Sequence, residues 1–80
     1  MNDNDEEQTG IIVTEVKPDS QARRSGISVG TLIFEVNRRA VTNARELAQA
    51  VNFAKERGAT NVVLEVKING ENHSVFLRLP

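Results

Sequence analysis

The 80-residue chain lacks cysteine, tryptophan and tyrosine, and it contains one histidine, two prolines and three phenylalanines. Without cysteine, no disulfide stabilises the chain and no thiolate ligand is available to a metal. Eighty residues suffice for one domain with a modest hydrophobic core. No apolar run approaches the roughly 20 residues that span a bilayer, and the acidic start differs from a secretory signal.

The distribution of charge argues against a nucleic-acid partner. The net charge is -1, but the segment Asp3–Glu7 alone contributes four negative charges. The remaining chain has ten Lys and Arg against seven Asp and Glu, and only Arg23-Arg24 and Arg38-Arg39 are adjacent. Nucleic-acid binding favours a basic stripe with interleaved aromatics, which this pattern does not provide.

The acidic start separates from the rest of the chain by composition. Residues 1–9 contain no apolar residue after Met1, which predicts a flexible acidic tail or linker. Residues 10–80 are apolar enough to form a folded domain. We therefore expect a single domain over 10–80.

The first half of that domain predicts two strands separated by a short helical turn. The β-branched segment Gly10–Val16 predicts a strand that ends before Pro18. Asp19 or Ser20 can cap a helical turn through residue 24, which Gly26 would close in the left-handed region. A second strand is expected over 31–36, followed by a turn at 37–39.

The second half predicts a longer helix and a hairpin. Asn43 with Glu46 three residues later approaches a capping box, and Gly58 is a C-terminal stop. Between them, apolar residues recur at helical spacing: Ala44, Leu47, Ala48, Val51 and Ala54. Two alternating segments, 62–68 and 75–79, then flank Asn69-Gly70, a strong hairpin dipeptide. The pattern predicts a mainly β fold with two helices.

The chain shows no constellation for catalysis, metal binding or a cofactor. His73 neighbours Ser74 on a predicted strand, where adjacent side chains point to opposite faces, so it cannot readily activate that hydroxyl. The one dense carboxylate cluster, Asp3–Glu7, lies in the predicted tail, where a solvated linker explains it. The alanine-rich helix face has two interpretations: close packing on a sheet, or one wall of a groove for a partner's side chains.

Four segments together resemble a PDZ domain: Gly10–Val16, Pro18–Ala22, Ser25–Gly30 and Leu32–Asn37. The family pattern there is an apolar strand, a Pro/Ser/Ala turn, an Ala-Gly-Leu step, a Gly-Asp turn and an Ile-x-x-Val-Asn-Gly strand. Asn43–Val51 resembles the helix that flanks the family's groove. The bacterial form of this pattern is similar to that of the PDZ domains in periplasmic HtrA (Deg) serine proteases. The final strand at the C-terminal end is similar to that of their second PDZ domain.

The sequence departs from the family pattern in three places, and each departure predicts a difference in structure or binding. Thr31 replaces the usual Asp, so the turn after Gly30 should lose a side-chain cap, and Arg38 replaces the Gly after Asn37, so that turn should differ. The family's carboxylate-binding loop (apolar-Gly-apolar) and its following strand belong upstream of Gly10, where residues 1–9 contain nothing similar. We therefore expect this chain to bind free C-terminal peptides weakly or not at all.

The resemblance implies a partly open β-sandwich that binds peptide segments or neighbouring protease and PDZ domains by strand addition. It would have no active site of its own and would present substrates or assemble oligomers of a periplasmic serine protease. The implied groove residues are Ile11, Ile12, Ala44, Ala48, Val51 and Asn52. Two alternatives stay open: an assembly domain that binds no free peptide, and the regulatory PDZ domain of a membrane metalloprotease.

Overall fold

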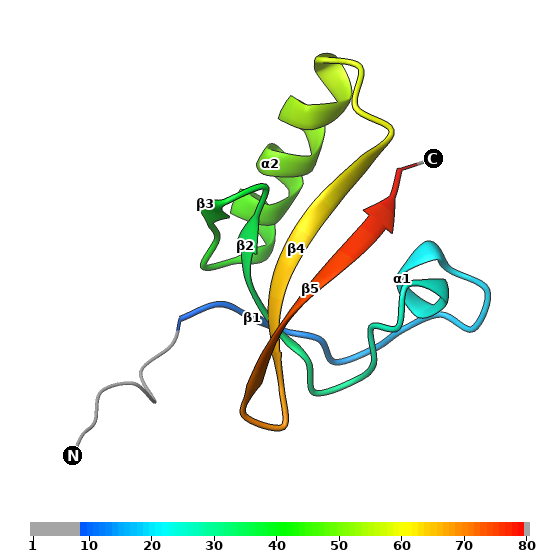
Figure 1. Ribbon diagram of the computed structural model, residues 1–80, viewed down its shortest axis with the longest axis vertical. Coiled ribbons are helices and arrows are strands. Elements are labelled where there is room, and N and C mark those ends of the chain that lie inside the picture. The colour runs from blue at the N-terminus through cyan, green and yellow to red at the C-terminus, as the bar shows by residue number, and fades with distance from the viewer. Residues whose placement is uncertain (1–8, 80) are drawn as a thin grey trace.

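The computed structural model describes residues 9–79, which form an antiparallel five-stranded sheet with two helices (Figure 1). The predicted class, mainly β with two helices and open rather than closed, is confirmed. No helix in this part of the chain has the length and apolar character needed to cross a bilayer. The elements are β1 (Ile11–Ile12), α1 (Gln21–Arg24), β2 (Leu32–Val36), β3 (Arg39–Ala40), α2 (Ala44–Glu56), β4 (Asn61–Ile68) and β5 (Glu71–Arg78).

The sheet runs in the order β1-β2-β4-β5, and β3 pairs with the same edge of β2 as β1 does. The β4–β5 hairpin is the longest pairing, and its register places Leu64 opposite Val75 and Val62 opposite Leu77. Asn69 and Gly70 both have positive φ (51° and 81°), as a two-residue type I′ turn requires. The predicted hairpin and its apolar face are therefore confirmed.

The core lies between the inner face of this sheet and α2, which contacts β2 and β4. Alternation along β4 supplies its centre, because every second side chain of a strand points to the same face. α1 lies at the other end of the sheet, against β5 (Figure 1). The buried apolar residues are Ile27, Ile33, Val36, Val41, Ala54, Val62, Leu64 and Val66.

The ends of α2 follow the sequence signals, with one difference at the start. Asn43 caps the helix by accepting a hydrogen bond from the Glu46 N–H at 2.9 Å. The Glu46 carboxylate reaches the N–H and hydroxyl of Thr42 (2.7 and 2.8 Å) rather than the N–H of Asn43, so the reciprocal capping box does not close. At the C-terminus, Gly58 has φ of +84° and ends the helix as predicted.

The core-facing side of α2 agrees with the predicted stripe in part. Leu47 and Ala54 of that stripe pack on the core, and Ala50, which was not predicted, joins them. Ala44 and Ala48, which belonged to the predicted stripe, are exposed. The periodicity allowed both stripes because alanine occurs on two adjacent helix faces, and the position of β2 and β4 selected one of them.

The first strand is shorter than the predicted 10–16. Regular pairing with β2 covers only Ile11 and Ile12. The next residue, Val13, forms hydrogen bonds with two successive residues: its N–H donates to the Thr31 carbonyl, and its carbonyl accepts from the Gly30 N–H. Two residues opposite one form a β-bulge, which bends a pairing strand and ends the ladder. The chain beyond Val13 therefore leaves β2 and runs to α1, where Ser20, one of the two predicted candidates, is the N-cap.

The turn at Thr31 keeps a side-chain cap, contrary to our expectation. The Thr31 hydroxyl accepts a hydrogen bond from the Ser28 N–H at 3.4 Å, and the Thr31 N–H donates to the Ser28 carbonyl at 3.2 Å. Only 1% of Thr31 is exposed, so this hydroxyl is inside the fold. A threonine oxygen thus takes the capping role for which the sequence pattern offered no aspartate.

We expect Thr31→Val to lower the free energy of unfolding by about 1 kcal/mol, since it removes the acceptor for Ser28 without changing the side-chain volume much. Urea unfolding followed by circular dichroism measures the difference. Thr31→Ser keeps the hydroxyl and serves as the matched control for the hydrogen bond. A Thr31→Val protein at least as stable as the wild type would show that this cap contributes nothing.

The turn after β2 forms despite the arginine at its second position. Asn37 and Arg38 have φ of 49° and 70°, and they connect β2 to β3, a short strand that the sequence did not predict. Glycine is the usual residue for such angles because it has no Cβ. The Asn37 side chain stabilises this conformation: its Oδ1 accepts from the Val63 N–H at 2.9 Å, and its own N–H donates to the Val63 carbonyl at 2.8 Å.

Candidate functional site

The outer edge of β1 is one part of the candidate site. β1 is the terminal strand of the sheet, and Val13 directs its N–H toward Thr31 on the β2 side. Backbone direction alternates along an antiparallel strand, so the N–H and C=O of Ile12 point away from β2. Among residues 9–79, no strand pairs with that edge. The Ile12 side chain is also 55% exposed, whereas Ile11 packs against the core.

One flank of α2 is the other part. Ala44, Ala48 and Asn52 are spaced four residues apart, so they line one side of the helix, and all three are exposed. Val51 lies next to them and is half-buried. This flank is turned by about 130° from the face that packs on the core, given 3.6 residues per turn. It offers a small, mainly apolar surface.

β2 connects the two parts, because β1 pairs with it at Ile33 and Leu32 and α2 packs on it. The predicted groove residues therefore fall on two elements that border the same strand. Of the six, Ile11 and Val51 are half-buried and the other four are exposed. Their role in binding stays a prediction.

The geometry of the single histidine matches its structural interpretation. The Ser74 hydroxyl donates to both oxygens of Glu65 at 2.9 Å, and His73 lies 3.6 Å from the Glu71 carboxylate with 48% of its side chain exposed. Within residues 9–79, no three His, Asp or Glu side chains are placed to hold a metal. The cluster Asp3–Glu7 and most of the predicted tail lie outside the described residues.

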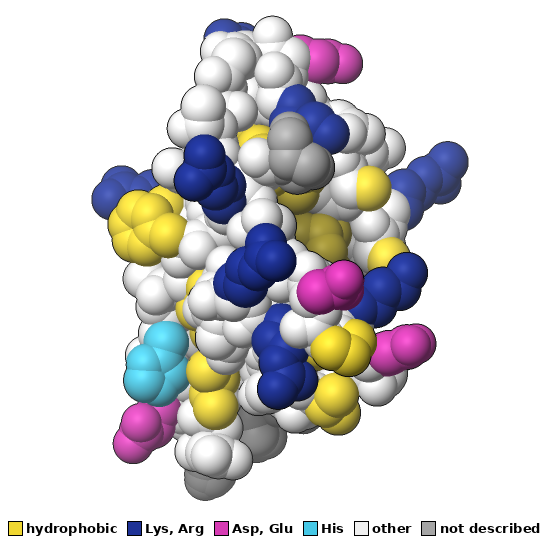
Figure 2. Space-filling view, turned by 90° about the vertical axis from the view of Figure 1, so that its right-hand side faces the viewer, with side chains coloured by type: hydrophobic (Ala, Val, Ile, Leu, Met, Phe, Trp, Pro, Cys, Tyr) yellow, Lys and Arg dark blue, Asp and Glu magenta, His cyan; other side chains and the backbone are white. Residues whose placement is uncertain are grey.

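The surface carries one charged feature that sequence reasoning missed. Arg39 from β3 and Arg57 at the end of α2 both lie over the ring of Phe53. The spacing of Phe53 and Arg57 by four residues was visible in the sequence, but the approach of Arg39 depends on the β2–β3 turn. On the face shown in Figure 2, by contrast, Lys and Arg side chains are spread among apolar and acidic ones.

The comparisons with known proteins agree on one family. The sequence model of the PDZ domain matches residues 1–72. A Brucella suis protein described as a probable periplasmic serine endoprotease DegP-like is 35% identical over 72 residues, which are 90% of this chain and 14% of that protein. The serine endoprotease DegS of Haemophilus influenzae is 35% identical over 57 residues, covering 71% of this chain and 17% of that protein.

Solved structures support the same assignment. The PDZ domain of HtrA3, determined with the phage-derived ligand FGRWV, superimposes with a TM-score of 0.74 and 31% identity, over 88% of this chain and 62% of that one. A PDZ domain protein from Parabacteroides distasonis gives a TM-score of 0.70 at 25% identity, over 86% of this chain and 15% of that one. The chain thus belongs to the PDZ domain family, whose members are non-catalytic protein-interaction modules, here similar to those of HtrA- and Deg-type serine proteases.

Proposed function

We propose that this domain binds extended peptide or protein segments by adding a strand to the outer edge of β1. The observation that carries the proposal is the backbone of Ile12, whose N–H and C=O point away from β2 with no strand beside them among residues 9–79. An exposed strand edge of this kind pairs readily with another chain, and the backbone bonds supply the affinity.

The flank of α2 would select the side chains of the added segment. Ala44 and Ala48 are small and exposed, so they leave room for a partner's side chains, and Asn52 adds a polar group at the end of the row. Val51 would form the apolar base of the groove. Alternate residues of an added strand point to one side, which matches a single row of helix positions.

The biological setting follows from the relatives and is also a proposal. The DegP-like relatives are named periplasmic serine endoproteases, and this chain spans 14% of their length. We infer that residues 10–80 form an interaction domain of such a protease, in the periplasm, where it presents substrates or assembles oligomers. The solved HtrA3 PDZ domain with its peptide ligand supports the peptide-binding part of this inference.

Calorimetric titration with peptides ending in Val, Leu, Phe or Ala, each as the free acid and as the amide, tests the binding mode. We expect binding that amidation leaves unchanged, because strand addition at the edge of β1 uses the peptide backbone rather than its terminal carboxylate. The variant Ile12→Pro should lower the affinity at least about tenfold, since proline removes the outward N–H of Ile12.

Ile12→Ala is the matched control, because it shortens the same side chain but keeps the backbone donor. Proline is tolerated at sheet edges, so the β1–β2 pairing should persist in the Ile12→Pro protein, as its thermal midpoint will report. Equal binding by both variants would contradict strand addition at this edge, and micromolar binding that amidation abolishes would reveal a carboxylate site instead. Sedimentation of the same proteins distinguishes a second copy of the chain as the occupant of the edge.

A further inference from the structure

A pair of arginines meets on one aromatic ring, away from the proposed groove. The guanidinium carbons of Arg39 and Arg57 lie 5.1 and 4.5 Å from the centroid of the Phe53 ring. Cations within about 6 Å of a ring face are attracted by its quadrupole. Phe53 is 44% exposed, so the cluster is accessible to solvent. We call these three residues the arginine cluster.

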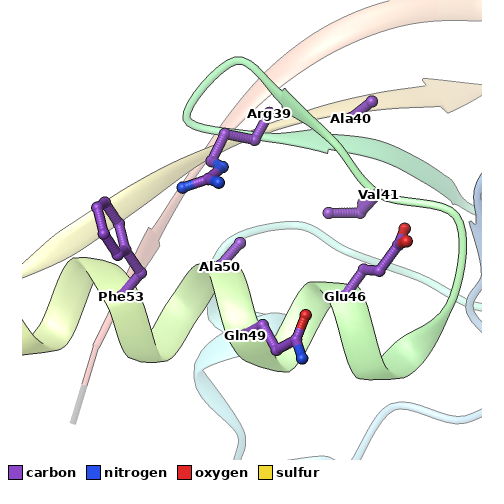
Figure 3. A pocket seen from close by; sticks show the side chains of 7 residues that line it. All are labelled: Arg39, Ala40, Val41, Glu46, Gln49, Ala50 and Phe53. Carbon is purple, nitrogen blue, oxygen red and sulfur yellow. The ribbon is translucent and has the colours of Figure 1, made fainter.

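The arginine cluster borders a pocket of about 340 Å³ between β3 and α2. Ala40, Val41 and Ala50 contribute apolar lining, and Arg39 turns toward Phe53 at one end (Figure 3). The Glu46 carboxylate lies at the other end of the pocket (Figure 3). This is the opposite flank of α2 from Ala44 and Ala48, so the pocket is separate from the proposed groove.

Neither arginine of the cluster forms an ion pair with a described residue. Among residues 9–79, no carboxylate lies within 4.0 Å of either guanidinium. The Glu46 carboxylate accepts hydrogen bonds from the Thr42 hydroxyl and from the Thr42 N–H. These bonds, the hydroxyl bond most, lower the pKa of the Glu46 carboxyl group. The Glu46 carboxylate is therefore bonded to Thr42 rather than to an arginine. The positive charges of Arg39 and Arg57 both lie over the Phe53 ring, where they repel each other. An incoming carboxylate would relieve their repulsion and gain two hydrogen-bonding partners.

The described chain enters the sheet at Gly10, beside that pocket. β1 runs antiparallel to β2, with Ile11 opposite Ile33, so the chain upstream of Ile11 heads toward Phe34. The Val41 N–H already donates to the Phe34 carbonyl at 3.1 Å, so the upstream chain must leave the edge next to Val41. Gly10 lies so close to the Ile33 carbonyl that a Cβ there would collide with it. Val41 lines the pocket.

We propose that the arginine cluster is a binding site for carboxylate-rich peptide segments, and that Asp3–Glu7 of the same chain occupies it. These residues are three to seven positions upstream of Gly10, which allows a reach of about 10–25 Å. Arg39 is two strand residues from Val41, about 7 Å. The acidic segment thus carries the complementary charge within reach of the cluster, and docking there keeps it away from the edge of β1.

Nuclear magnetic resonance of the arginine side chains tests this in the full chain. The comparison protein carries four neutralising changes, Asp3→Asn, Asp5→Asn, Glu6→Gln and Glu7→Gln. At low salt, we expect the Nε–H signals of Arg39 and Arg57 to differ between the wild type and this neutral-tail variant. At 1 M salt, where the Debye length is about 3 Å, the difference should disappear.

The signals of Arg23 and Arg24, which end α1, serve as the internal control and should not depend on the tail charges. A synthetic peptide with the sequence of residues 1–8 provides the second readout. It should shift the Arg39 and Arg57 signals of the neutral-tail variant at a concentration at least about tenfold lower than in the wild type, because a tethered segment competes at an effective millimolar concentration. The double variant Arg39→Gln, Arg57→Gln in the neutral-tail background should not bind it.

Three results would overturn the proposal. Identical Arg39 and Arg57 signals in the wild type and the neutral-tail variant at low salt would show that the acidic segment does not contact the cluster. Equal peptide binding by these two proteins would show that the segment is not the occupant. Binding that survives the double arginine substitution would place the peptide elsewhere. Because the Arg39 and Arg57 side chains are exposed, the amide spectrum of the double arginine variant should stay native.

Discussion

Replacing Leu64 by alanine should lower the free energy of unfolding by about 2–5 kcal/mol, the range measured for deleting a buried leucine. Leu64 is 1% exposed at the centre of β4, between Val36 of β2 and Val75 of β5. An 80-residue domain has on the order of 4–12 kcal/mol of total stability, so this one change removes a large share of it. The thermal midpoint should fall by more than about 10 °C.

Val29→Ala is the comparison, because it also removes methyl groups but from a side chain that is 64% exposed. Val29→Ala should change the free energy of unfolding by no more than about 0.5 kcal/mol. Thermal and urea unfolding, both followed by circular dichroism, measure the two variants side by side. If Leu64→Ala and Val29→Ala unfolded at the same midpoint, the side of β4 that carries Leu64 would not be the core.

Replacing Asn37 by alanine should lower the free energy of unfolding by about 1–3 kcal/mol, the second largest effect that we expect. Two contributions add: the Val63 N–H loses its acceptor at 2.9 Å, and alanine must occupy a left-handed conformation at φ of 49°. Asparagine tolerates that conformation better than alanine does. The side-chain amide therefore acts as a substitute for a backbone carbonyl where β2 ends.

Two further substitutions separate the contributions. Asn37→Gly relieves the left-handed conformation but still lacks the acceptor, so it should recover part of the loss. Asn37→Asp keeps an acceptor oxygen, and it should stay closest to the wild type at high salt, where repulsion from Glu35 and Glu65 is screened. Equal stability of Asn37→Ala and the wild type would mean that the bond to Val63 is not formed in solution.

Local chemistry accounts for the features that could be predicted. Alternation marked the buried face of β4, positive-φ residues marked the turn at Asn69-Gly70, and Ser20, Asn43 and Gly58 marked helix ends. Each of these signals depends on neighbours within a few positions. The combination of segments is also specific enough to indicate the PDZ family, and the family match confirms it.

Features that depend on distant parts of the chain could not be predicted in this way. The length of β1 is set by the bulge at Gly30 and Thr31, and the core face of α2 is set by where β2 and β4 lie. Alanine residues lie on two faces of α2, and alanine alone does not indicate which helix face is buried.

The sequence by itself determined the class of fold, the family, the hairpin and the ends of both helices, because those depend on short-range backbone preferences and on side-chain periodicity. Only the tertiary structure decided which backbone groups of β1 face outward, which flank of α2 is exposed, and that Arg39 meets Arg57 over Phe53. These three facts arise from strand pairing and helix packing between residues far apart in the chain. The edge and the flank define the proposed groove, and the arginine pair defines the proposed site for the acidic segment.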